Sequence, residues 1–169
     1  MRRLLVISLA LAIGGGSSAF AAQIGTRGPD HIVGTAAADR IDGRAGDDEI
    51  EGAEGADWLR GGMGADMLLG GPGADRLFGG PGADALTGDS GDDLLVGGPG
   101  VDTMLGGAGN DRINAAAGPG DVVVGGAGDD VIGARDGAPD LITCGAGRDR
   151  VNADLVDRVA SDCERVKRG

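Results

Sequence analysis

The sequence predicts an all-β protein, a right-handed parallel β-solenoid with two sheets, 18 residues in each coil and a disulfide-tied C-terminal cap. Aspartate recurs every nine residues along most of the chain, and an aliphatic side chain follows each aspartate by two positions. Glycine makes up 37 of the 169 residues, a density at which an ordinary globular core is hard to order. A period this regular indicates a stacked repeat architecture.

The repeated residues define the elements of each coil. The aspartates are Asp30, Asp39, Asp48, Asp57, Asp66, Asp75, Asp84, Asp93, Asp102 and Asp111. The aliphatic residues are Ile32, Ile41, Ile50, Leu59, Leu68, Leu77, Leu86, Leu95, Met104 and Ile113. Each aliphatic residue and its two neighbours predict a short strand with the aliphatic side chain facing inward. Glycine-rich turns join the strands, so two strands and two turns complete one coil, and residues 25–114 give about five coils.

Stacking of 18-residue coils places aspartates side by side along two edges. One edge carries Asp48, Asp66, Asp84 and Asp102, and the other carries Asp57, Asp75, Asp93 and Asp111. Two like charges about 5 Å apart repel by roughly 3 kcal/mol at an effective dielectric near 20, which a thin core cannot offset over several coils. A divalent cation between neighbours reverses the sign of this interaction. The pattern therefore indicates a metal-binding protein.

Calcium is the cation that this pattern favours. It accepts about six to eight oxygen ligands in flexible geometry, including the backbone carbonyls that glycine-rich turns leave accessible. Magnesium demands stricter octahedral geometry. Zinc prefers cysteine or histidine, and His31 is the only histidine in the chain. A solvated acidic repeat without metal is the alternative, but it does not explain why the aspartate always occupies the same position.

The best-formed units read G-G-x-G-x-D-x-U-x, where U is aliphatic, and they begin at Gly61, Gly70, Gly79, Gly97, Gly106 and Gly125. This pattern resembles the hemolysin-type, or RTX, calcium-binding nonapeptide repeat over about residues 25–152. The resemblance is to a short, exported, stand-alone form, and it implies a β-roll with several Ca²⁺ ions between neighbouring turns, held by aspartate carboxylates and turn carbonyls. The expected ligand positions are Asp48, Asp57, Asp66, Asp75, Asp84, Asp93, Asp102, Asp111, Asp130, Gly61, Gly64, Gly70, Gly73, Gly79, Gly82, Gly97, Gly100, Gly106 and Gly109.

The ends of the chain depart from the repeat. Residues 1–21 read as a signal peptide, with two arginines, an apolar stretch over 4–13 and an A-x-A site at 19–21. Ten apolar residues fall short of the about 20 that span a bilayer, so a membrane anchor is the weaker alternative and no membrane insertion is expected after cleavage. We therefore expect an extracellular protein, with release and association with the cell surface both open.

The remaining residues divide into three predicted parts. Residues 22–114 form the regular calcium-binding roll, although the units at Gly25 and Gly34 lack turn glycines and predict an N-terminal cap with weak or absent calcium binding. Residues 115–152 form irregular coils, because Asp121 and Asp140 each follow one inserted residue. Residues 153–169 form a C-terminal cap, since solenoids need atypical ends.

The two cysteines, Cys144 and Cys163, both lie near the C-terminus. An even pair in an exported protein predicts a disulfide. Two free thiols in a metal site are the alternative, which lacks further ligands.

Charge and residue types restrict the function. The formal net charge of −12 disfavours nucleic acid and anionic membranes as partners. No nucleophile–base pair is visible, so we do not expect an enzyme. The expected function is extracellular calcium binding that drives folding of a structural or interaction module, and the alternative is a calcium-dependent adhesin for a protein or glycan. An outward stack of Arg40, Trp58 and Arg76 predicts either a small binding patch or plain surface packing.

Overall fold

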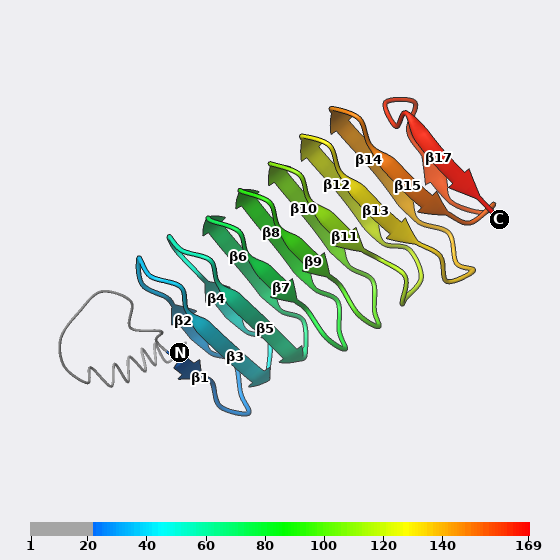
Figure 1. Ribbon diagram of the computed structural model, residues 1–169. Helices are drawn as coiled ribbons and strands as arrows, with labels where there is room; N and C mark the ends of the chain where they lie inside the picture. The colour runs from blue at the N-terminus through cyan, green and yellow to red at the C-terminus, as the bar shows by residue number, and fades with distance from the viewer. Residues whose placement is uncertain (1–21) are drawn as a thin grey trace.

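The computed structural model describes residues 22–169 as a β-solenoid of two parallel sheets, with no helix among these residues (Figure 1). The predicted signal peptide, residues 1–21, lies outside the described part of the chain. Since no described segment is helical, none of them could cross a membrane as a helix. The coils stack in chain order from one end of the molecule to the other (Figure 1). This architecture confirms the predicted two-sheet solenoid.

Odd-numbered strands form the first sheet and even-numbered strands form the second. In the described residues the first sheet contains β1 (Ala22–Ile24), β3 (Arg40–Ala45), β5 (Trp58–Met63), β7 (Arg76–Phe78), β9 (Leu94–Val96), β11 (Arg112–Asn114), β13 (Val131–Ala134), β15 (Arg150–Ala153) and β17 (Arg165–Arg168). The second contains β2 (His31–Val33), β4 (Glu49–Glu51), β6 (Met67–Pro72), β8 (Ala85–Ser90), β10 (Thr103–Ala108), β12 (Val122–Ala127), β14 (Leu141–Ala146) and β16 (Arg158–Val159).

The pairing register confirms the coil length. Leu59 of β5 lies opposite Leu77 of β7, which lies opposite Leu95 of β9, so partners are 18 residues apart. From β10 to β15 the separation is 19, as in the pair of Met104 and Val123. It shortens to 17 between β14 and β16 and to 15 between β15 and β17. The inserted residues lie in turns, so the parallel register of both sheets continues through them to β16 and β17.

The core is one thin line of aliphatic side chains from each sheet. Every repeat aliphatic residue points inward between neighbours that are partly or fully exposed, as the x-U-x pattern predicts. The buried residues are Ile32, Ile41, Ile50, Leu59, Leu68, Leu77, Leu86, Leu95, Met104, Ile113, Val123, Ile132, Ile142 and Val151. Fully burying one such side chain contributes about 1.5–3 kcal/mol, so a single residue in nine supplies a modest hydrophobic stabilisation.

The two ends close the core differently. At the N-terminal end Gln23 occupies the inward position opposite Ile41, and its side-chain amide donates a hydrogen bond to the carbonyl oxygen of Val33 at 3.0 Å. At the C-terminal end Cys144 and Cys163 form the predicted disulfide, with Cα atoms 5.2 Å apart. Cys163 packs against the core, so the bridge fastens the last coil to the one before it.

Several strands are longer than the predicted three residues. β5 runs for six residues, because Gly62 and Met63 in the turn pair with Arg44 and Ala45 of the preceding coil. Turn backbones of neighbouring coils therefore lie directly on one another. This close stacking leaves no room for side chains at some glycine positions.

Substitution of Gly80 by alanine is expected to destabilise the roll strongly. Gly80 has a φ of +111°, a conformation that favours glycine, and a methyl group there would overlap the carbonyl oxygen of Gly62. Backbone overlap and strain together should lower the free energy of unfolding by about 2 kcal/mol or more. Urea unfolding in saturating calcium measures the effect. Gly28→Ala is the matched control, since a methyl group there meets nothing within 4 Å, and equal midpoints for the two variants would refute the steric argument.

Candidate metal sites

The repeat aspartates are buried at the turns, where they form two ladders along the edges of the solenoid. In each ladder the backbone N–H of one aspartate donates to Oδ1 of the aspartate one coil later, as from Asp66 to Asp84 at 2.8 Å and from Asp84 to Asp102 at 2.9 Å. One ladder contains Asp30, Asp48, Asp66, Asp84, Asp102, Asp121, Asp140 and Asp157. The other contains Asp39, Asp57, Asp75, Asp93, Asp111, Asp130 and Asp149. The predicted aspartate neighbours on each edge therefore lie side by side.

The second oxygen of most ladder aspartates has no hydrogen-bond partner. Within residues 22–169, twelve buried Oδ2 atoms lack a donor, those of Asp48, Asp57, Asp66, Asp75, Asp84, Asp93, Asp102, Asp111, Asp121, Asp130, Asp140 and Asp149. Native proteins satisfy nearly all buried polar atoms, because an unpaired one costs about 1–3 kcal/mol. A row of unpaired carboxylate oxygens at one repeat position therefore points to a missing cationic partner.

A backbone carbonyl oxygen of the next coil lies near seven of these carboxylates, those of Asp48, Asp57, Asp75, Asp84, Asp93, Asp111 and Asp130. A methyl group built on Gly70 would lie 2.5 Å from Oδ2 of Asp75 and 2.9 Å from the carbonyl oxygen of Gly88. The two oxygens thus face the same small volume, which only glycine leaves open. The arrangement recurs beside Gly43, Gly52, Gly79, Gly88, Gly106 and Gly125. Carboxylate and carbonyl oxygens from two adjacent coils converge at each of these turns.

Other turn carbonyls border the same gaps between coils. A methyl group built on Gly80 would overlap the carbonyl oxygen of Gly62, and one built on Gly82 would overlap that of Gly64. In the described residues no group of three or more His, Cys, Asp or Glu side chains could hold a metal ion. A bound ion would therefore need backbone carbonyls as well as carboxylates, which is a donor set that calcium accepts and zinc does not favour.

The predicted glycines occupy two different places in these turns. The first-position glycines, Gly61, Gly70, Gly79, Gly97 and Gly106, lie against Oδ2 of the aspartate in their own turn. The fourth-position glycines, Gly64, Gly73, Gly82, Gly100 and Gly109, pack against a carbonyl oxygen at the same position one coil earlier. Both sets thus leave space for main-chain oxygens, and the first set borders the carboxylates directly.

The pKa values of eleven ladder carboxyls are raised, those of Asp48, Asp57, Asp66, Asp75, Asp84, Asp93, Asp102, Asp111, Asp121, Asp130 and Asp140. Burial is the main cause, the hydrogen bond from the backbone of the preceding aspartate opposes it, and the neighbouring carboxylates add to it. The pKa rises to about 7 for Asp84, Asp93 and Asp121. It rises to about 6 for Asp48, Asp57 and Asp130. Without a cation the folded turns therefore disfavour the ionised carboxylates that a metal ion requires.

The first turn of each ladder is built differently. The backbone N–H of Thr26 donates to Oδ2 of Asp30 at 2.5 Å, and the backbone N–H of Thr35 donates to Oδ2 of Asp39 at 2.5 Å. The hydroxyl of Thr35 adds a second hydrogen bond to the same oxygen at 2.9 Å. Threonine stands here at the second turn position, where the regular units have glycine. These two carboxylates already have protein donors, and weak or absent calcium binding at the N-terminal cap stays a prediction.

Three of the aspartates with an unpaired Oδ2 were not among the predicted ligands. Asp121, Asp140 and Asp149 continue the two ladders and carry the same unpaired Oδ2. Inserted residues shift Asp121 and Asp140 off the nine-residue spacing, and the turns before them depart from the glycine pattern. The signal that survives in the sequence is the aliphatic residue two positions later, at Val123, Ile142 and Val151.

A family model for the RTX calcium-binding nonapeptide repeat matches the chain in four copies, over residues 24–59, 60–95, 87–119 and 120–151. The four copies span most of the solenoid and contain all twelve aspartates with an unpaired Oδ2. No curated protein matches the chain.

Proposed function

The chain belongs to the RTX calcium-binding nonapeptide repeat family, and we propose that it binds several Ca²⁺ ions outside the cell and folds by binding them. The observation that carries this proposal is the set of twelve buried aspartate Oδ2 atoms without a hydrogen-bond donor. RTX repeats bind calcium, and proteins that contain them are typically secreted. The predicted signal peptide agrees with an extracellular site of action.

Calcium binding and coil stacking depend on the same contacts. Each candidate site joins a carboxylate of one coil to a carbonyl of the next, as with Asp75 and Gly88. A site is therefore complete only when two coils are stacked. Stacking in turn brings carboxylates close to one another, and their mutual repulsion requires a cation. Because the aliphatic core is one residue wide in each sheet, metal coordination supplies stabilisation that the core lacks.

The role that follows is a structural or interaction module rather than a catalyst. The RTX β-roll is a structural calcium-binding fold, and its buried carboxylates are committed to the two ladders. His31, the one imidazole, lies at an outward strand position with Nδ1 3.0 Å from a carboxylate oxygen of Glu49. We propose no catalytic residue.

Calcium titration of the chelated protein tests the proposal. Far-ultraviolet circular dichroism should show a cooperative gain of β-structure, reversed by chelation and reproduced poorly by magnesium. Trp58 gives an independent fluorescence signal, since it lies under the guanidinium of Arg40 and 5.6 Å from the ring of Phe78 in the next strand of the sheet. A chelated protein that is already folded, and that calcium does not change, would refute the proposal.

A further inference from the structure

The outer faces of the two sheets differ in charge. The outer face of the first sheet, called here the basic face, carries Arg40, Arg60, Arg76, Arg112, Arg150, Arg165 and Lys167, with Asp42 as its acidic residue. The outer face of the second sheet carries Glu49, Glu51, Arg158 and the exposed apolar residues Val33, Met67, Leu69, Leu105 and Leu141. The repeat motif does not fix these outward positions. A basic face on a chain of net charge −12 is therefore a feature that the calcium sites do not explain.

In one outward row of the basic face, arginines recur at every second coil from β3 to β15, and Arg165 of β17 then follows Arg150 directly. The row runs in register through Arg40, Trp58, Arg76, Leu94, Arg112, Val131 and Arg150. Neighbouring strands lie about 4.8 Å apart, so successive arginines of this row are roughly 10 Å apart. An apolar side chain occupies each position between two arginines. The row thus alternates a cation with an apolar platform along the solenoid axis.

The arginines of this row are available to a ligand. Arg40, Arg76, Arg112 and Arg150 are exposed, and among the described residues none of them forms an ion pair with an acidic side chain. Arg60 is the exception on this face, with a guanidinium nitrogen 3.9 Å from Asp42. The guanidinium of Arg40 lies 4.1 Å from the centre of the Trp58 ring, in a cation–π contact.

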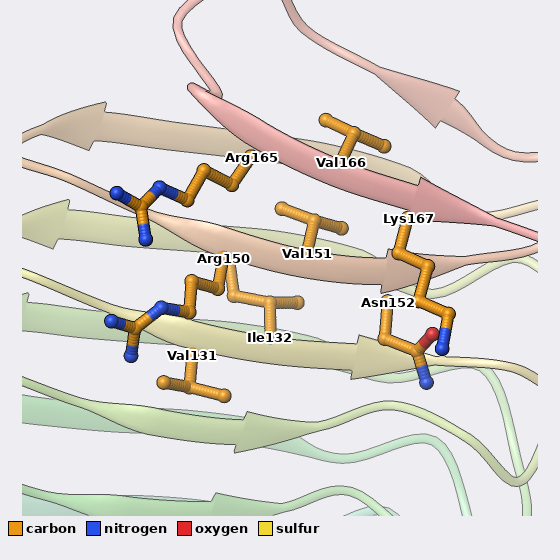
Figure 2. Close-up of a pocket in the computed structure, with 8 residues that line it drawn as sticks. All are labelled: Val131, Ile132, Arg150, Val151, Asn152, Arg165, Val166 and Lys167. Atoms are coloured by element: carbon orange, nitrogen blue, oxygen red, sulfur yellow. The ribbon is translucent and has the colours of Figure 1, made fainter.

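The C-terminal end of the row opens into a pocket of about 420 Å³ on β13, β15 and β17. Figure 2 shows the side chains of Arg150 and Arg165 extending the same way from neighbouring strands, with Asn152 and Lys167 together on the other side. Val131 lines the same pocket from the neighbouring strand β13. Paired guanidinium groups suit a carboxylate, and an amide suits sugar hydroxyl groups.

We propose that the basic face binds a linear acidic polysaccharide that lies along the solenoid axis and carries one carboxylate on every second sugar. Two strand spacings are comparable to the length of a disaccharide in an extended chain, so carboxylates would meet successive arginines. The C–H faces of the intervening sugars would pack on Trp58, Leu94 and Val131. This inference rests on the proposed function, because the stacked coils hold the row in register.

Nucleic acid fits the row less well. Phosphates follow one another every 3.4 Å or so along a duplex strand, much closer than the arginines of the row. Single strands are bound by series of aromatic platforms, whereas the basic face offers Trp58 and Phe78 only at its N-terminal half. The spacing and the apolar positions therefore favour the polysaccharide.

The test is a titration of the calcium-saturated protein with hyaluronate fragments long enough to span the row. Hyaluronate alternates a uronate with a neutral amino sugar and does not gel with calcium. We expect a Trp58 fluorescence change, matched by calorimetry and weakened by salt. The double variant R76Q/R112Q should bind about tenfold more weakly or worse. The control R27Q/R158Q removes the same charge from exposed positions off the basic face and should change the affinity less than about twofold.

Circular dichroism of the same samples separates the two proposals. A protein that folds on calcium addition but does not bind hyaluronate overturns this inference and leaves the proposed function intact. Equal weakening by the control pair, equal binding of neutral dextran, or tighter binding of single-stranded DNA would each overturn it as well. A protein that calcium does not fold refutes the proposed function instead.

Discussion

Replacing Asp84 by asparagine is expected to raise the calcium concentration at half-folding by about tenfold or more, because a charge-assisted ligand is lost in mid-roll. Asparagine keeps an acceptor for the backbone N–H of Asp66, which bonds Oδ1 of Asp84 at 2.8 Å. It removes the charge at the unpaired Oδ2, so the change is aimed at the cation alone. Asp84 has a ladder neighbour in the coil before it and in the coil after it, so the loss of its charge should weaken the calcium sites on both sides. Calcium titrations followed by circular dichroism give the calcium concentration at half-folding for the unmodified protein and for Asp84→Asn.

Two controls make the Asp84 result interpretable. Glu54→Gln removes one negative charge from an exposed turn position and should leave the calcium midpoint unchanged within about twofold. Asp39→Asn alters a ladder residue whose Oδ2 already accepts hydrogen bonds from Thr35, so its effect on calcium should be smaller than that of Asp84→Asn. If all three variants shifted the midpoint equally, the ladder aspartates would not be ligands.

The coil and its core could be predicted from the sequence because a solenoid gives each repeat position one environment. Leu77 lies between Leu59 and Leu95, one coil away on either side, so residues that are 18 apart in the sequence are in register in the sheet. The disulfide was also predictable, since an even pair of cysteines near one end of a chain that is expected to be exported indicates a disulfide.

Other features of the turns and of the core end depend on side-chain geometry, which the nine-residue spacing of the sequence does not determine. The aspartate pairs were predicted as bare repelling charges, but Oδ1 of each accepts a backbone N–H of its neighbour, which leaves only Oδ2 for a cation. The donation from Thr35 to Asp39 depends on how one turn is shaped. Gln23 as the polar end of the core could not be recognised either, because β1 precedes the first aspartate of the repeat.

The metal-free protein is expected to gain β-structure as the pH falls from about 8 to about 5.5. In the folded roll the carboxyl pKa values are raised from 3.8 to about 7 for Asp84, Asp93 and Asp121, mainly by burial. For groups with a raised folded pKa, the stabilisation by protonation is fully present below pH 3.8 and is lost as the pH rises through about 7. Chelated protein followed by circular dichroism should therefore unfold as the pH rises. The range lies above the isoelectric point of about 4.3, so the chain stays negatively charged throughout.

Saturating calcium should reverse this dependence, since only ionised carboxylates bind the cation and protons compete with it. The calcium concentration at half-folding is expected to rise as the pH falls below about 7, where Asp84 and its neighbours begin to protonate. Opposite pH trends with and without calcium would show that the same carboxyl groups control both the folding of the metal-free protein and its folding by calcium. A metal-free spectrum that is constant over this range would show instead that the ladder carboxylates are not buried in the absence of calcium, and that the metal-free chain never forms the stacked turns.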